Sequence, residues 1–233
     1  MIVYGKNVVK EIINNNQKIE KVYISYDFSD QNLISALQKK QIRINYLTKK
    51  ELDKLVNGLH QGIIVSIPDY QYYSLEDLII GNNDIIVALD HLEDPHNLGA
   101  IIRTCEAAGV SGIIIPKDRS VDVNSTVMKT SAGALDNMKI AMVTNLNKAI
   151  DKLKEKGFWV VGTEMNAKTS YMDIDYKAPI CLVIGNEGSG MSRLVKETCD
   201  YIVSIPMEGK INSLNASVAT GIMIYGILEK RRK

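Results

Sequence analysis

The chain has few cysteines and no long apolar run, and both absences narrow what it can be. Its 233 residues include three cysteines, Cys105, Cys181 and Cys199, and no Cys-x-x-Cys pair. Cys105 and Cys181 sit in apolar periodic segments, so we expect buried free thiols and a reducing, cytoplasmic compartment. No apolar run reaches the roughly 18 residues of a membrane span, and the N-terminus lacks a signal-peptide layout.

Metal ligands and excess charge are scarce as well. The three histidines, His60, His91 and His96, have no zinc-ligand spacing with a cysteine or carboxylate cluster, so the sequence predicts no metal site. The formal net charge is +1, which does not by itself indicate a nucleic-acid binder. Contacts with RNA would have to come from local basic patches, whose plainer interpretation is solvated helix ends. These patches are Lys39–Lys40, Lys49–Lys50 and the run from Lys230 to Lys233.

The first 68 residues alternate helix and strand patterns. Apolar spacing predicts helices over 5–16, 29–40 and 48–58, and the last has a Thr48–Glu51 capping box. Short apolar runs predict strands at 21–25, 42–47 and 62–68. We therefore expect a small α/β domain over 1–68, followed by a linker over 69–83 that is rich in tyrosine and ends in Gly81-Asn82-Asn83.

From Asp84 the alternation restarts and continues towards the C-terminus. The strand-like runs are short, β-branched and almost continuously apolar, which is typical of a parallel sheet with both faces covered by helices. Helix patterns fall at 97–108, 124–135 and 145–157, and a last helix is expected from about Ser213 to Lys230. The expected fold class is α/β, with 84–233 as the larger domain.

Two strand-like runs of this domain, 180–185 and 201–206, each lead into a loop of glycine and small polar residues. GNEGSGMS (185–192) nearly matches the phosphate-binding G-x-x-x-x-G-K-[ST] pattern, but Met191 replaces the lysine and Glu187 would repel a triphosphate. The dinucleotide pattern G-x-G-x-x-G fails at Arg193. The loop therefore favours a ligand that is not strongly anionic, and its glycines let a flat group approach the backbone.

Two further segments carry candidate polar residues. SIPMEGKINSLNAS (204–217) starts the last helix, for which Asn212 or Ser213 is the expected N-cap, with Asn215 in the first turn. DHLEDPHNLGAIIRTCEAAG (90–109) opens a helix at Asn97 and places Arg103 among apolar residues. An arginine at such a position is an ordinary surface residue, the partner of a carboxylate, or a ligand for an anion.

These three segments resemble, in order and spacing, the three motifs of the SpoU (TrmH-like) branch of the SPOUT methyltransferases. The motifs read DPHNLGAIIRTCEAAG, VIGNEGSGM and IPMEGKINSLNASVATGI. YGKNVVKEI, HQG, KTSAGAL and NLNKAIDKLKEKGFWVVGTE further resemble the RlmB-like subgroup, which methylates a guanosine ribose in 23S ribosomal RNA. The resemblance covers nearly the whole chain.

The resemblance implies a fold, a cofactor and partners. The first domain would be L30e-like and hold ribosomal RNA, and the second would be a SPOUT domain with a trefoil knot at its C-terminal end. The cofactor would be S-adenosylmethionine, bound by the knot loops. The protein would be a cytoplasmic homodimer, joined through the second domain, that methylates the ribose 2′-OH of a 23S rRNA guanosine.

Motif positions also imply site residues. The catalytic positions are matched by Arg103, Asn97, Glu187, Ser213 and Asn215. The cofactor-contact positions are matched by Thr163, Glu164, Gly185, Asn186, Gly188, Ile205, Met207 and Leu214. A guanidinium group is too weak a base to deprotonate a hydroxyl. We therefore expect Arg103 to grip an RNA phosphate and to stabilise a developing alkoxide.

Three alternatives stay open beside this reading. They are a tRNA guanosine 2′-O-methyltransferase, a noncatalytic RNA-binding module for ribosome assembly, and a nucleotide-dependent α/β enzyme. The L30e-like first domain favours rRNA over tRNA. The complete set of catalytic-position residues argues against a noncatalytic module, and the failed nucleotide motifs argue against the third alternative.

Overall fold

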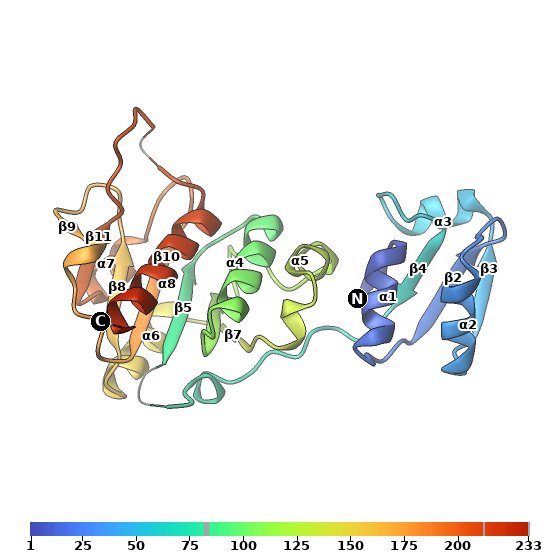
Figure 1. Ribbon diagram of the computed structural model, residues 1–233, viewed down its shortest axis with the longest axis horizontal. Coiled ribbons are helices and arrows are strands. Elements are labelled where there is room, and N and C mark those ends of the chain that lie inside the picture. The colour runs from blue at the N-terminus through green and yellow to red at the C-terminus, as the bar shows by residue number, and fades with distance from the viewer. Residues whose placement is uncertain (82–83, 212, 233) are drawn as a thin grey trace. The chain divides into compact units, whose positions relative to one another are not determined.

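The computed structural model describes residues 1–81, 84–211 and 213–232, which form two compact units, Met1–Gln71 and Tyr72–Lys233 (Figure 1). The stretch expected as a linker divides between them. Leu75 and Leu78 are buried in the core of the second unit, and the Tyr72 hydroxyl accepts a hydrogen bond of 2.9 Å from the Val123 N–H. Most of that stretch therefore packs with the second unit; Asn82 and Asn83 lie outside the described residues.

The first unit is built on a four-stranded mixed sheet in the order β1-β4-β2-β3. β4 (Ile63–Ser66) pairs antiparallel with β1 (Ile2–Tyr4) and β2 (Lys21–Ser25), whereas β2 and β3 (Ile44–Leu47) are parallel. Helices α1 (Lys6–Asn14), α2 (Gln31–Lys39) and α3 (Lys49–Leu55) occupy the predicted positions. β1 is an addition to the prediction, because three residues are too few to show an alternating pattern.

The second unit contains a seven-stranded sheet, and every pairing in it is parallel, as predicted. The order is β7-β6-β5-β10-β8-β11-β9. Central strands β5 and β10 are buried almost along their full length, which explains their continuous apolarity. The strands are β5 (Ile85–Asp90), β6 (Gly112–Pro116), β7 (Ile140–Val143), β8 (Trp159–Thr163), β9 (Thr169–Ser170), β10 (Ile180–Gly185) and β11 (Tyr201–Ser204).

Five helices of this unit are described, with single 3₁₀ turns between some strands. They are α4 (Pro95–Ala107), α5 (Ser125–Ser131), α6 (Leu146–Glu155), α7 (Arg193–Thr198) and α8 (Ala216–Arg232). α4 begins two residues before the expected start, because the Asp94 carboxylate accepts from the N–H groups of His96 and Asn97. α5 ends early because Ala132 and Gly133 adopt left-handed conformations, with φ of 48° and 84°. No helix in the described part of the chain is long and apolar enough to cross a membrane.

The strand order decides where the loops meet. β8 lies between β10 and β11 in the sheet, although it precedes both in the chain. Because all three strands are parallel, their carboxyl ends are neighbours at one edge. The segments that follow these strands therefore converge there, which is where α/β sheets usually bind ligands.

Candidate functional site

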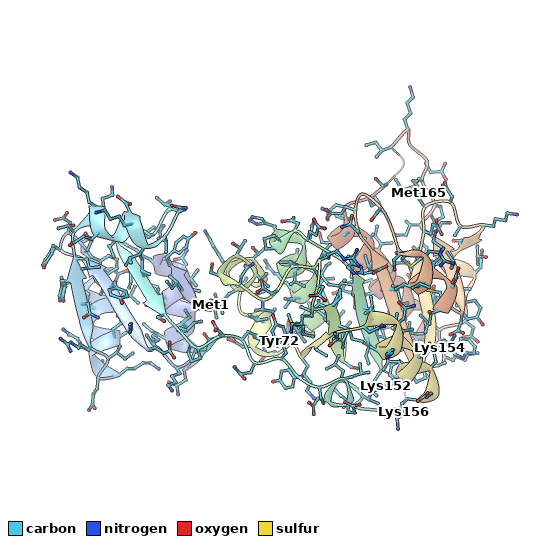
Figure 2. The ribbon with its side chains drawn as sticks, turned by 180° about the vertical axis from the view of Figure 1, so that it is seen from behind. Met1, Tyr72, Lys152, Lys154, Lys156 and Met165 are labelled. Atoms are coloured by element: carbon cyan, nitrogen blue, oxygen red, sulfur yellow. The ribbon has the colours of Figure 1, made fainter. Side chains whose placement is uncertain are left out.

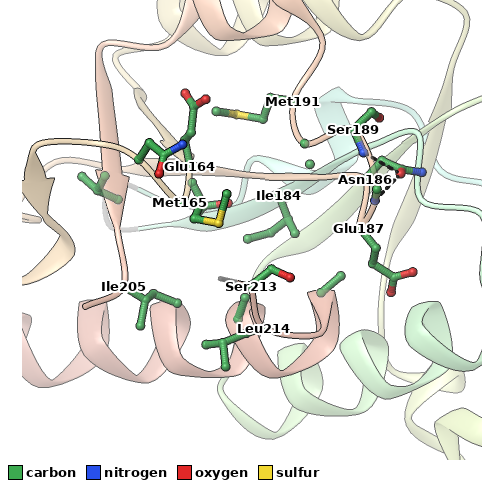
Figure 3. Close-up of a pocket in the computed structure, with 18 of the residues that line it drawn as sticks. Glu164, Met165, Ile184, Asn186, Glu187, Ser189, Met191, Ile205, Ser213 and Leu214 are labelled. Carbon is green, nitrogen blue, oxygen red and sulfur yellow. Dashed lines mark hydrogen bonds between the residues drawn. The ribbon is translucent and has the colours of Figure 1, made fainter. Parts of the chain in front are cut away.

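A pocket of about 280 Å³ lies at the converging strand ends (Figure 3). Its lining comes from three separate segments and one residue of α7, Lys196. The segments are 163–166 at the end of β8, 184–191 at the end of β10, and residues from Val203 of β11 to Ala219 of α8. The lining includes all eight residues at the expected cofactor-contact positions, together with Glu187 and Ser213 of the expected catalytic positions. The two glycine-bearing loops, which the resemblance assigns to one cofactor, thus border one cavity.

The loop after β10 folds back on itself and forms one wall. Asn186 and Gly190 exchange two backbone hydrogen bonds, of 3.0 and 2.8 Å. The Asn186 side-chain oxygen accepts from the N–H groups of Gly188 and Ser189 (Figure 3). A Cβ atom on Gly185 would lie 2.3 Å from the carbonyl carbon of Gly190, so only glycine fits there. Gly185 therefore serves the shape of the loop.

A buried carboxylate ties this loop to the end of β5. Asp90 is 1% exposed, and it accepts hydrogen bonds from the Ser192 N–H at 2.5 Å and from Nδ1 of His91 at 2.6 Å. The Asn186 side-chain amide donates to the His91 carbonyl at 2.8 Å. Sequence reasoning did not identify Asp90, whose only signal was an acidic residue at the end of a buried strand. Its place indicates a positioning role for the pocket wall.

Met191 shows why the phosphate-binding pattern fails here. It is 6% exposed, and its side chain both lines the pocket and belongs to the apolar core. A Cβ atom on Gly162 would come within 2.7 Å of both the Met191 side chain and the Cys199 sulfur. A lysine at position 191 would therefore be buried among apolar groups, instead of reaching a phosphate in the pocket.

The charges of the lining favour a cationic ligand. Glu164, which follows β8, forms an ion pair of 2.5 Å with Lys196 of α7. Lys196 is the one basic residue among the described lining residues, and its charge is offset by this pair. Glu187 then remains as a carboxylate at the pocket. In the view of Figure 2, Lys152 and Lys154 of α6 and Lys156, which follows it, stand at the opposite end of this unit from the lining residue Met165.

Three residues at the expected catalytic positions form one hydrogen-bonded chain. The Asn97 amide donates to the Glu187 carboxylate, and the Asn215 amide donates to the Asn97 oxygen at 2.9 Å. Asn97 is 7% exposed, whereas Glu187 and Asn215 lie at the surface. These hydrogen bonds join the start of α4, the loop after β10 and the residue before α8. Segments far apart in sequence are thus brought together through Asn97.

Asn215 also caps α8, which corrects the expected cap. Its side-chain oxygen accepts from the N–H groups of Ser217 at 2.9 Å and Val218 at 3.4 Å. α8 therefore starts at Ala216, not at Ser213, which is exposed and lines the pocket. The alternative cap, Asn212, lies outside the described residues. One side chain therefore holds both Asn97 and the end of the helix.

Arg103 stands apart from the pocket lining. It lies on α4 and is exposed. Among the described residues, its guanidinium group has no hydrogen-bond or ion-pair partner. Pairing with a carboxylate is therefore not its role within the described part of the chain. A surface residue or a ligand for an external anion remains.

The cysteines offer no nucleophile to the site. All three are free, and Cys105 and Cys181 are fully buried, as predicted. Burial raises the pKa of both thiols above the ordinary range. Partial burial, and then the charge of Asp200, raise the pKa of Cys199 to about 12. At neutral pH these groups are uncharged thiols, which are poor nucleophiles.

Comparisons with known proteins identify the family. The model of the SpoU rRNA methylase family matches residues 84–225. The chain belongs to this family. A second model, described as RNA 2′-O ribose methyltransferase substrate binding, matches residues 2–73. The chain is therefore an RNA 2′-O-ribose methyltransferase, as the resemblance implied.

Similar proteins match over both units. One relative is YacO from Bacillus subtilis (strain 168), whose name places it in the TrmH family of tRNA/rRNA methyltransferases. It is 43% identical over 237 residues, which cover 98% of this chain and 95% of YacO. The AdoMet-bound rRNA methyltransferase of Sinorhizobium meliloti has a TM-score of 0.80 at 27% identity and covers 98% of this chain and 86% of its own. AviRb of Streptomyces viridochromogenes, a SpoU methyltransferase in complex with AdoMet, has a TM-score of 0.83 at 22% identity, covers 100% and 91%, and shares the fold.

Proposed function

We propose that this SpoU methylase transfers a methyl group from S-adenosylmethionine to the ribose 2′-OH of a guanosine in 23S ribosomal RNA. The observation that carries the proposal is the pocket, because its lining includes every expected cofactor-contact position and adjoins the Asn97–Glu187 hydrogen bond. The choice of 23S rRNA rests on the resemblance to the RlmB-like subgroup along the chain. A tRNA guanosine is the competing substrate, since the relatives are named for both RNA classes.

The residues present fit S-adenosylmethionine. Gly185 and Gly188 bring backbone to the pocket, and Ile205 and Leu214 supply apolar surface for a flat adenine ring. The Glu187 carboxylate favours a positively charged ligand, because Glu164 and Lys196 offset each other and leave the lining with a net negative charge. When bound, this cofactor supplies a methyl group that its cationic sulfur already activates. The remaining tasks fall to the protein.

Arg103 is the residue that we assign to the RNA. A ribose hydroxyl is a weak nucleophile at neutral pH, so its proton must leave as the new bond forms. The exposed guanidinium group is suited to bind an RNA phosphate and to stabilise negative charge on the 2′-oxygen. Because guanidinium is a poor base, we assign the proton to that phosphate or to a water.

The other expected catalytic positions would keep the site in its geometry during methyl transfer. They are Asn97, Glu187, Ser213 and Asn215. Asn97 is buried and engaged at both ends of its amide, so it fixes Glu187 and the start of α8 relative to α4. Glu187 and Ser213 themselves line the pocket. Such positioning contributes to catalysis because a reacting pair must be aligned before methyl transfer.

We also propose a trefoil knot and a homodimer through the second unit. Both follow from the resemblance. A feature that supports the dimer is α8, whose Val218 and Tyr225 are 50% and 52% exposed and lie seven residues apart on one helical face. Sedimentation of the intact protein should give twice the mass of the chain, and Tyr225→Asp should shift it towards the monomer. A monomeric mass for the unmodified protein would exclude the dimer.

The test of the substrate is a methyl-transfer assay with radiolabelled S-adenosylmethionine. Unmodified 23S rRNA and unmodified tRNA, transcribed in vitro, serve as parallel acceptors. Label in 23S rRNA that digests to 2′-O-methylguanosine is the expected result. Label in tRNA alone would move the substrate to the competing class. Binding of S-adenosylmethionine without transfer to either RNA would favour a noncatalytic RNA-binding module.

A further inference from the structure

We propose that one edge of the first unit's sheet binds unpaired RNA bases, with the rings of Tyr26 and Tyr46 as a stacking platform. The inference rests on the proposed function, because it names the surface with which the first unit would hold the RNA substrate. It starts from two exposed tyrosines and from the HQG motif, His60–Gly62, for which the methyl-transfer site has no use.

Strand directions bring four segments to this edge. β2 and β3 are parallel and end here, and β1 ends here too, because both β1 and β2 run antiparallel to β4, which begins here. Tyr26 directly follows β2, and Tyr46 lies one residue before the end of β3. The Tyr26 N–H donates to the Leu47 carbonyl at 3.2 Å, so the two strand ends are joined.

The two tyrosine rings stack on each other, and both side chains stay accessible. Their centroids lie 6.0 Å apart and their planes differ by 26°. Tyr26 is 69% exposed and Tyr46 is 44% exposed. A cross-strand aromatic pair adds only modestly to stability, and it does not need this exposure. Exposed, nearly parallel rings are what proteins use to stack unpaired bases.

Lysines flank the rings. Lys49 and Lys50 are exposed and open α3 immediately after β3. Lys6 has its Nζ 5.1 Å from the centroid of the Phe28 ring, two residues beyond Tyr26. Glu51 accepts from Thr48, and Asp53 from His60, so both carboxylates are held within the unit although they keep their negative charge. Together with Asp27 they offset part of the positive charge, but the lysines still supply the phosphate contacts that single-stranded RNA binding requires.

The HQG motif braces this edge. His60 is 4% exposed; its Nε2 donates to the Asp53 carboxylate at 2.9 Å, and its Nδ1 accepts from the Gly62 N–H at 3.0 Å. Gln61 accepts from the Lys6 N–H at 2.8 Å, and the Ser25 N–H donates to the Gly62 carbonyl at 2.8 Å. These bonds tie the loop before β4 to the ends of β1 and β2. The platform is therefore formed before RNA arrives, which lowers the entropic cost of binding.

The partner is a loop, bulge or single strand of RNA. A base within a regular duplex already stacks on its neighbours and exposes no face to a tyrosine ring. The platform would therefore discriminate between unpaired and paired RNA. It would do so with little dependence on sequence, because every base has a face that can stack.

The test measures RNA affinity of the full chain by fluorescence anisotropy. The probes are a labelled 12-nucleotide single strand and a blunt duplex of the same sequence. Changing both Tyr26→Ala and Tyr46→Ala should weaken single-strand binding about 10-fold or more, and duplex binding should change little. The double change to phenylalanine should restore affinity, because it keeps both rings. Tyr73→Ala, at an exposed tyrosine of the second unit, is the matched control and should have no effect.

A second measurement separates charge from stacking. The double change Lys49→Gln and Lys50→Gln should reduce the slope of log affinity against log salt by about 1.4, which corresponds to two lost phosphate contacts. Undiminished single-strand binding by the alanine variant, or an equal loss in the phenylalanine variant, would overturn the stacking platform and leave methyl transfer by the unmodified protein untouched. Tyrosine-dependent binding by a protein that methylates neither RNA would instead refute the proposed function alone.

Discussion

At the scale of single residues, Asn97 is the position on which we expect the site to depend most. It is buried, and its amide group both donates to Glu187 and accepts from Asn215. Removing its amide deletes two hydrogen bonds, which link α4 to the loop after β10 and to the start of α8. Each such bond contributes about 0.5–1.5 kcal/mol to stability, so the effect should extend beyond catalysis.

Asn97→Ala should lower the free energy of unfolding by about 1–3 kcal/mol and reduce methyl transfer. Asn97→Asp should reduce transfer further, because it places a second carboxylate against Glu187. Urea denaturation and the methyl-transfer assay measure the two effects. Asn57→Ala, at an exposed asparagine of the first unit, is the control. Unchanged stability and transfer in Asn97→Ala would show that the hydrogen-bonded chain is dispensable.

The thiols give a prediction about pH. Burial holds the pKa of Cys199 at about 12, above the value of 9.0 for a free thiol. A group whose pKa is raised by folding adds stability below its unfolded value, and that contribution is lost as the pH rises through the folded value. Thermal unfolding should therefore show this contribution declining between pH 9 and about 12. Cys199→Ser should make that decline smaller, while the buried Cys105 and Cys181 keep their own share of it. An identical decline in the variant would assign it to other groups.

At the scale of elements, the loop after β10 owes its shape to Gly185. A methyl group there would collide with the backbone of Gly190 and Met191, so the loop would have to move. Gly185→Ala should therefore weaken S-adenosylmethionine binding about 10-fold or more, by displacing the pocket wall. Isothermal titration measures this. Gly209→Ala is the matched control, since a Cβ atom there meets nothing within 4 Å. Equal affinities of the two variants would refute the account of this wall.

Much of the element pattern was predictable, and the failures have physical causes. Long periodic runs, such as those of α6 and β10, reveal themselves because burial imposes the pattern on them. β1, β9 and the two-turn α7 were not predicted, since they are short and owe their structure to neighbouring segments. The predicted cap of α8 was wrong because a distant contact orients the residue that caps it. The Asn215 amide donates to Asn97, 118 positions away, and its oxygen then accepts from the first N–H groups of the helix.

The candidate site divides in the same way. The two glycine-bearing loops were visible in the sequence, and so was the unsuitability of Met191 for phosphate. Asp90 was not, because only the folded chain shows which loop its carboxylate holds. The sequence also could not show that β8 enters the sheet between β10 and β11, which is what merges the two loops into one pocket.

At the scale of the whole molecule, the two units suggest a division of labour that a truncation can test. A chain that begins at Tyr72 keeps Leu75 and Leu78 in the core of the second unit. It should still bind S-adenosylmethionine but methylate RNA far more slowly, because it lacks the unit that we propose holds the RNA. A chain that begins at Gly81 should instead lose stability, since it lacks two buried leucines worth roughly 2–5 kcal/mol each. Equal loss of cofactor binding and RNA methylation in the longer chain would contradict this division.

We propose above all that this methyltransferase acts on the ribose 2′-hydroxyl of a guanosine in 23S rRNA. The most direct measurement maps 2′-O-methyl groups in all RNA from cells that lack the gene, beside cells that carry it. The account predicts the loss of one 2′-O-methylguanosine from 23S rRNA, with its return when the unmodified gene is restored and not when Arg103→Ala is supplied. Unchanged methylation of 23S rRNA would contradict it, whether a methyl group is lost from tRNA instead or no RNA loses one.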